Sequence, residues 1–240
     1  MTLYLVILAS FFTASISAIT GMGGGIALLS IMTFLPYTHR QLVAIHGLIQ
    51  LMSNSSRMYF LRENVDKKIV KSFLLGLLPS AFVVMFLLKE LGDLRRLQLL
   101  IAGLIFYVLF KPKKLKPLKI KKENFYILGL LIGFLGPLIG ATGPFLAPFF
   151  LRDDLVKNEI IATKAAVQML GHMIKLPIFI YAGFNYFDFS TEILGYLLLT
   201  ILGTRFGVYL LKLLSEQTFR LIYKGVLFLS ALRILYVQLL

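Results

Sequence analysis

Long apolar segments recur along the whole sequence, and they constrain the fold more than any other feature. Of the 240 residues, 58% are hydrophobic and only 15% are charged, and the mean hydropathy is +0.86. A helix needs about 20 apolar residues to cross a bilayer. The apolar segments are roughly 3–20, 24–36, 42–60, 70–88, 97–110, 125–139, 143–151, 158–182, 190–213 and 220–240. We therefore expect an all-α polytopic membrane protein without a separate soluble domain.

The chain is strongly basic, with a net charge of +14. In a soluble protein this excess would suggest nucleic acid as the partner. Here many Lys and Arg residues lie in short loops, where they orient the chain and meet anionic lipid. We therefore expect the lipid bilayer as a partner and no nucleic acid. No Lys or Arg precedes Arg40, so the start lacks the charged region of a signal peptide, and we expect residues 1–36 to belong to the fold.

A basic connector divides the sequence into two halves that resemble each other. Its core, "KPKKLKPLKIKK" (111–122), holds seven lysines and two prolines. We predict a first membrane repeat over 1–110, the connector over 111–124 and a second repeat over 125–240. A shift of 118 residues aligns 41–60 with 159–178, where Ala44 matches Ala162 and Gln50 matches Gln168. In each repeat, we expect a glycine-broken segment, re-entrant or half-length, followed by three transmembrane helices.

The loop charges indicate that the two repeats are inverted. If each glycine break is a full crossing, the basic residues divide almost evenly between the two sides. If each break is a hairpin, fifteen basic residues collect on one side and four on the other. The larger set is Arg62, Lys67, Lys68, Lys71, the seven connector lysines, Arg152, Lys157, Lys212 and Arg220, and the smaller is Arg40, Lys89, Arg95 and Arg96. The positive-inside rule favours the hairpins and a cytoplasmic connector. Both arrangements of the breaks stay open at this stage.

Two glycine-rich stretches interrupt apolar segments at corresponding places in the halves. The first is "GMGGG" (21–25), and the second is "GPLIGATGPFLAP" (136–148), with Gly25 aligned on Gly143. Glycine reaches the backbone angles of a turn at membrane depth without steric cost. Freed backbone groups are tolerated there only where they line a cavity, as in transporters built from inverted repeats. The alternative is close helix packing through small residues four positions apart.

The two aligned helices each carry a stripe of polar side chains. The residues are His46, Gln50, Asn54 and Arg57 in the first helix, and Lys164, Gln168, His172 and Lys175 in the second. The spacing of 4, 4 and 3 places each set within roughly 80° of arc, and such a stripe should avoid lipid. Neither stripe contains a carboxylate. Donors, cations and glycine breaks at helix N-termini are suited to an anion.

We therefore predict one substrate site between the halves. Its expected residues are Gly23, Gly24, Gly25, His46, Gln50, Asn54, Gly140, Thr142, Gly143, Lys164, Gln168 and His172. Arg57 and Lys175 lie near helix ends, and we expect them to extend to the interface; Lys164 has the same alternative. His46, Asn54 and the two glutamines have the alternative of hydrogen bonding between helices. We expect no metal and no cofactor, and the chain has no cysteine.

Three stretches resemble the sulfite exporter TauE/SafE family of small-anion permeases. They are "SAITGMGGGIALLSIMTFL" (17–35), "GPLIGATGPFLAPFFL" (136–151) and "LGTRFGVYLLKLLSEQTFRLIYKGVLFLSALRIL" (202–235). The resemblance covers nearly the whole chain. It implies a permease for sulfite, thiosulfate, an organosulfonate such as sulfoacetate, or a related small anion. The second break departs from the family pattern, because Ala141, Thr142 and Pro144 replace a run of glycines.

We therefore expect a multi-pass permease of the bacterial inner membrane that works by alternating access around a central site. Proton coupling, where it occurs, should depend on His46 or His172. Two alternatives remain: an accessory subunit without transport of its own, and an intramembrane lipid-processing enzyme. The acidic clusters that such an enzyme needs are missing, since the eleven acidic residues fall almost entirely in loops, and we predict no enzyme. Homo-oligomer formation is left open.

Overall fold

The described part of the chain is helical throughout. The computed structural model describes residues 2–87, 98–110 and 120–239, and these contain no strand. Lys89, Arg95, Arg96 and residues 111–119 of the predicted connector lie outside the described residues. The expected all-α fold is confirmed. Its helices are α1 Thr2–Thr20, α2 Gly24–Met32, α3 His39–Phe60, α4 Lys67–Leu87, α5 Gln98–Phe110, α6 Phe125–Ile139, α7 Gly143–Phe150, α8 Lys157–Met173, α9 Lys175–Tyr181, α10 Ser190–Leu213 and α11 Glu216–Leu239.

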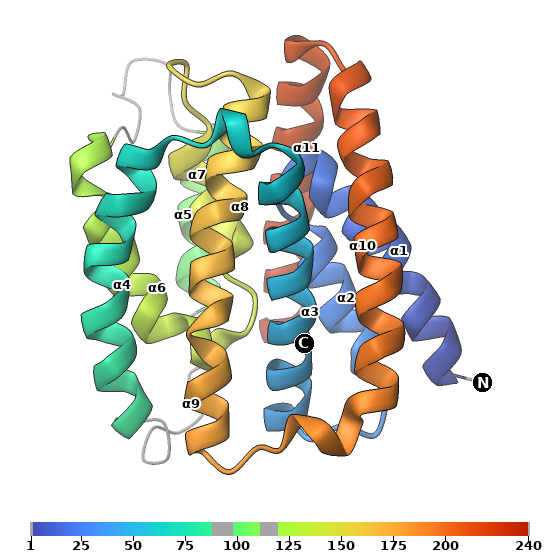
Figure 1. Cartoon of the computed structure of the whole chain (residues 1–240). Helices are drawn as coiled ribbons and strands as arrows, with labels where there is room; N and C mark the ends of the chain where they lie inside the picture. Colours follow the sequence, from blue (N-terminus) through green and yellow to red (C-terminus); the bar gives the residue numbers. More distant parts are fainter. Residues whose placement is uncertain (1, 88–97, 111–119, 240) are drawn as a thin grey trace.

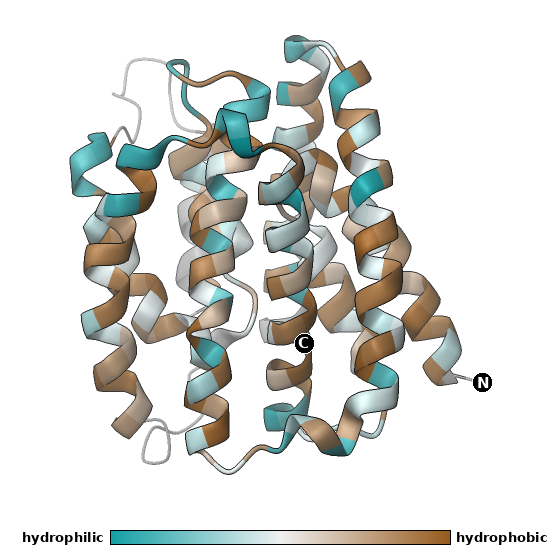
Figure 2. Cartoon of the chain, in the orientation of Figure 1, coloured by the Kyte–Doolittle hydropathy of each residue, from teal (hydrophilic) through white to brown (hydrophobic). Residues whose placement is uncertain are grey.

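Several helices have the length and composition of membrane spans. Among the described residues, three stretches meet both criteria: Leu3–Thr20, Lys67–Leu87 and Tyr186–Leu213. Large apolar side chains on these helices, such as Leu75 and Leu198, face outward and are more than half exposed. Figure 2 shows hydrophobic residues along the helices and hydrophilic residues gathered toward their ends. An exposed apolar belt of this kind is suited to lipid, and the chain is an integral membrane protein.

Two polar helices form the centre of the bundle. α3 and α8 pack against each other, with the α4–α6 pair on one side and the α1–α10 pair on the other (Figure 1). α5 and α11 form a further contacting pair. Helix α3 begins with a capping box, in which the Thr38 side chain accepts from the Gln41 N–H and the Gln41 side chain accepts from the Thr38 N–H. Because both central helices are covered by apolar ones, their polar stripes are shielded from lipid.

The bundle has two ends, which we name by their loops. Residues 61–66 and 120–124 lie at the connector end, where the Arg152 guanidinium donates to the Ile120 carbonyl and the Asp66 N–H donates to Thr163. Residues 33–38 and 182–185 lie at the far end, where Arg40 donates to the Ala182 carbonyl. α1 runs toward the connector end and α2 turns back from it, whereas α6 runs toward the far end and α7 turns back (Figure 1).

Ion pairs join the loops at the connector end. Lys122 lies 2.7 Å from the Asp66 carboxylate, and Lys68 pairs with Glu123. Partial burial raises the pKa of Asp66, but hydrogen bonds from Lys122 and from the Ile69 N–H outweigh it and lower that pKa overall. The start of α4 is thereby fixed to the short 3₁₀ turn Lys122–Asn124 that precedes α6.

Helices α4 and α6 approach so closely that glycine is required at the crossing. A Cβ on Gly76 would clash with the Tyr126 carbonyl, and one on Gly129 would clash with the Phe73 carbonyl. Small residues allow backbones to meet in this way, and dispersion forces then hold the helices together. The packing role of small residues, an alternative raised for the glycine breaks, is seen at this crossing.

The α1–α10 crossing is built in the same way. Gly203 faces the Phe11 carbonyl and Gly207 faces the Ser15 carbonyl, at distances that leave no room for a Cβ. The Ser15 hydroxyl also donates to the Gly203 carbonyl at 3.0 Å. Each crossing joins the first helix of one half, α1 or α6, to the helix that follows the polar helix in the other half, α10 or α4.

The predicted helix over 158–182 is divided in two. α8 ends at Met173, and α9 begins at Lys175. The cause is Pro177, which has no N–H and whose ring would clash with the Met173 carbonyl one turn earlier. The break brings the Lys175 side chain back toward the core.

The α4–α6 crossing yields a stability prediction. Gly76→Ala should lower the free energy of unfolding by about 1–3 kcal/mol, because the added methyl group forces two backbones apart. Gly225→Ala in α11 is the matched control, since a Cβ there meets no described atom within 4 Å. Thermal unfolding of the purified protein in detergent measures both. Equal melting temperatures for the two variants would contradict the close crossing.

Candidate functional site

Both glycine breaks are sharp turns between a long helix and a short one. Gly21 and Gly23 have φ of 68° and 78° in the first break, and Gly140 has φ of 74° in the second. Side chains other than glycine are strained at such angles. The Thr20 hydroxyl contacts the Met22 carbonyl at 2.6 Å, and the Gly21 N–H donates to the Ser17 carbonyl at 2.7 Å. Local hydrogen bonds therefore satisfy backbone groups that the break releases.

The first break folds the chain back on itself. The Cα of Gly24 lies so close to α1 that an added Cβ would clash with the Thr13 carbonyl and approach Ser17. Helix α2 therefore returns along α1. At the second break the Lys175 ammonium donates to the Gly140 carbonyl at 2.6 Å. The side chain at the start of α9 thus completes the second turn.

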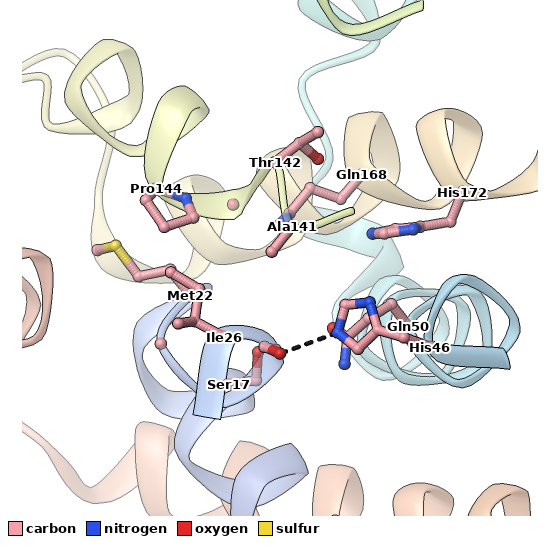
Figure 3. Close-up of a pocket in the computed structure, with 13 residues that line it drawn as sticks. Ser17, Met22, Ile26, His46, Gln50, Ala141, Thr142, Pro144, Gln168 and His172 are labelled. Atoms are coloured by element: carbon pink, nitrogen blue, oxygen red, sulfur yellow. Dashed lines mark hydrogen bonds between the residues drawn. The ribbon is translucent and has the colours of Figure 1, made fainter. Parts of the chain in front are cut away.

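The two breaks meet at a small cavity inside the bundle (Figure 3). Its volume is about 10 Å³, which is room for one water molecule. α1 and α2 with their break contribute one wall, α7 and its break another, and α3 and α8 the remainder. The lining residues are Ser17, Met22, Gly23, Gly25, Ile26, His46, Gln50, Ala141, Thr142, Gly143, Pro144, Gln168 and His172.

Each central helix places one glutamine against the short helix of its own half. The Gln50 amide lies beside Gly25, where a Cβ would come within 2.9 Å of Oε1. The Gln168 amide lies beside Gly143, where a Cβ would come within 3.0 Å of Nε2. These are the pairs that the 118-residue shift aligns. Glycine at each position lets the amide reach the N-terminal end of the short helix, where the helix dipole is positive.

Two histidines lie on the same cavity wall. The ring centroids of His46 and His172 are 6.4 Å apart. His46 Nε2 lies 2.8 Å from the Gly25 carbonyl, which can only accept, so Nε2 carries the proton. Nδ1 of both rings and Oε1 of Gln168 are buried without a hydrogen-bond partner among the described residues. The cavity therefore contains unsatisfied polar atoms from three side chains, and such atoms usually find a ligand or water.

Eight of the twelve predicted site residues line the cavity. They are Gly23, Gly25, His46, Gln50, Thr142, Gly143, Gln168 and His172. The other four lie next to it. Gly24 faces α1, and Gly140 packs against Leu29 and Val43. The Asn54 amide donates to the Gln50 carbonyl at 2.7 Å, and Lys164 contacts Tyr223 and Gly21.

Five lining residues were not predicted from the sequence: Ser17, Met22, Ile26, Ala141 and Pro144. Ser17 lies one helical turn before the first break, and the other four flank glycines that were predicted. The only sequence feature that could have identified them is their position beside a glycine break. Apolar residues give no chemical indication of a polar site.

The expectation that Arg57 and Lys175 extend to the interface is wrong. Arg57 is 0% exposed and Lys175 is 1% exposed. Arg57 lies within α3, beneath α8 and α10, and the break at Ile174 turns Lys175 inward to the Gly140 carbonyl. Lys164 is also fully buried, so the interface alternative fails for it too.

None of the cavity's lining side chains is a carboxylate. The described residues also contain no group of three His, Cys, Asp or Glu that could hold a metal ion. The site offers amides, imidazoles, hydroxyl groups and backbone N–H groups. These are the groups that surround an anion.

The fold and the cavity together define a class: a helical membrane protein whose polar site lies at broken helices inside the bundle, as in membrane transporters. The family model described as "Sulfite exporter TauE/SafE" matches residues 6–234, and the chain belongs to this family, as its resemblance suggested. No curated protein and no solved structure matches the chain significantly.

Proposed function

We propose that this protein is a permease that exports a small sulfur oxyanion or organosulfonate of the sulfite, thiosulfate and sulfoacetate class. The family is one of membrane sulfite or anion exporters. The observation that carries the proposal is the meeting of two helix N-termini, two glutamines and two histidines at one buried cavity without a carboxylate. The protein acts as a transporter and not as an enzyme.

The chemistry of the cavity favours an oxyanion. The short helices α2 and α7 both direct N-terminal ends toward it, and each end contributes partial positive charge. The Gln50 and Gln168 amides can each donate to an oxygen of the anion. Both are neutral, so the ion is held by hydrogen bonds and dipoles and not by a permanent ion pair.

The cavity is too small for sulfite as it stands, since about 10 Å³ accommodates one water molecule. Binding must therefore widen it, and we assign this structure to a closed state between two open ones. The reciprocal crossings α1–α10 and α4–α6 support two inverted repeats that move against each other. Alternating access would then expose the same glutamines first to one end and then to the other.

The loop charges support an orientation. Lys68 and Lys122 lie at the connector end, where they pair with Glu123 and Asp66, and Arg152 donates to the Ile120 carbonyl at the same end. The positive-inside rule places this end in the cytoplasm of a bacterial inner membrane. The far end, with Arg40, then faces outward.

The substrate can be tested with the purified protein on a solid-supported membrane. We expect a saturable current after a concentration jump of sulfite, thiosulfate or sulfoacetate, and none with lactate. The double variant Gln50→Ala, Gln168→Ala should reduce the response at least tenfold, because each lost hydrogen bond to an ion is worth about 1.5–3 kcal/mol. Gln217→Ala, an exposed glutamine at the start of α11, is the matched control.

Electroneutral exchange produces no current, so radiolabelled counterflow is measured in the same vesicles. Absence of both signals would contradict independent transport. Recovery on adding membrane extract would then favour the accessory-subunit alternative. Chemical conversion of the anion would favour an enzyme.

Proton coupling, where it occurs, should depend on His46 or His172, and His46 offers the clearer test. Its Nε2–H is held by the Gly25 carbonyl, so protonation adds the second donor at Nδ1, inside the cavity. If transport is coupled to protonation of this ring, the transport rate should rise several-fold between pH 8 and pH 5.5. His46→Gln keeps a donor for the Gly25 carbonyl and should make the rate independent of pH, whereas His39→Gln, at the exposed start of α3, should not. A rate that is flat over this range in the native protein would refute histidine coupling.

The inverted topology can be tested by cysteine labelling, because the native chain has no cysteine. Lys121→Cys lies at the connector end and Asn185→Cys at the far end, and both positions are exposed. A membrane-impermeant maleimide should label Asn185→Cys from outside intact cells and Lys121→Cys only after lysis. Labelling of both from the same side would refute the hairpin arrangement.

A further inference from the structure

Two buried cations lie beside the cavity on its connector side. Arg57 is seven residues beyond Gln50 on α3, and Lys164 is four residues before Gln168 on α8. At 1.5 Å per residue, these separations are roughly 10 Å and 6 Å toward the connector end. Both side chains are 0% exposed, and neither lines the cavity.

The Arg57 guanidinium is mostly without partners. Nη2 donates to the Ser53 hydroxyl at 3.3 Å, and Ser53 contacts Thr204 of α10 at 3.4 Å. Nε and Nη1 are buried and have no hydrogen-bond partner among the described residues. Arginine remains charged in proteins, so two of its donor groups face the interior with nothing to accept from them.

The Lys164 ammonium also has few hydrogen-bond partners. Its ammonium lies 3.3 Å from the Tyr223 hydroxyl and 5.1 Å from the centre of that ring. The Tyr223 hydroxyl gives its proton to the Ala147 carbonyl at 3.0 Å, so its oxygen is the acceptor for Lys164. Lys164 and Arg57 lie on the packed helices α8 and α3, both displaced from the cavity toward the connector end. No ion pair joins either cation to a carboxylate in the described part of the chain.

Two cations buried on the same side of the cavity without a counter-ion are costly, whereas an anion bound by both would offset their charge and accept from the unmet donors. We propose that Arg57 and Lys164 form a second anion site, on the connector side of the glutamine cavity, that takes a small inorganic oxyanion. The guanidinium fork matches two oxygens of such an ion, and the ammonium supplies a third contact.

The second site deepens the proposed function and rests on it for the identity of the ion. An anion that enters from the connector end meets Arg57 and Lys164 before the two glutamines. The far end has a different arrangement, because the Lys175 ammonium is already bonded to the Gly140 carbonyl. Arg205 serves as the control, because it is an exposed cation of α10 outside both polar stripes.

The test is equilibrium dialysis of radiolabelled sulfite against the full-length protein in lipid nanodiscs. The native protein should bind two sulfite ions per chain. Arg57→Gln and Lys164→Gln should each leave one bound sulfite, at the glutamine cavity. The affinity of the second site for sulfite should fall at least about tenfold. Arg205→Gln should keep two. The second site is tested with two separate variants, so that a variant that fails to fold does not decide the result. Native stoichiometry in a folded Arg57→Gln or Lys164→Gln protein would overturn the second site.

Failure of the second site and failure of the proposed function give different binding results. One sulfite per chain, lost in the Gln50→Ala, Gln168→Ala variant and retained in Arg57→Gln, would preserve the permease and overturn the second site. If the native protein neither binds nor transports sulfur oxyanions, the proposed substrate is wrong. Bromide then replaces sulfite, and its anomalous scattering in crystals decides the second site: a peak beside Arg57 supports it, and none overturns it.

Discussion

Polar backbone and side-chain groups inside a lipid-covered bundle must find partners within the protein, and this requirement governs the rest of the structure. At the two breaks, the partners are the Thr20 hydroxyl, the His46 ring and the Lys175 ammonium. Each comes from a different helix, so the breaks cannot be maintained without α3 and α9 in place. The polar site and the fold are therefore stabilised by the same contacts.

The apolar part of the bundle obeys a complementary constraint. Lipid provides little drive for helices to associate, so α4–α6 and α1–α10 depend on close backbone approach at Gly76, Gly129, Gly203 and Gly207. These crossings hold the outer helices as two tight pairs that flank α3 and α8. The polar helices α3 and α8 are thus enclosed between two closely packed pairs.

The sequence predicted the helical membrane fold and the family, and it identified most of the cavity. Gln50 and Gln168 were found because polar residues stand out at helical spacing in apolar segments, and the glycines because they interrupt such segments. Arg57 and Lys175 were misplaced, because distance from a helix end does not reveal what covers that end. Lys175 moved inward through the break that Pro177 causes. Met22 and Ile26 could not be identified from the sequence, because apolar residues that line a cavity have the same pattern as apolar residues of the core.

The neutral glutamine pair has a consequence for turnover. A carrier must release its cargo on every cycle, and a bound ion that faces a fixed charge dissociates slowly. With amides at the centre and Arg57 and Lys175 displaced toward opposite ends of the column, an ion in the cavity would face no permanently charged side chain. For the permease that we propose, such neutral contacts would favour rapid release over tight retention.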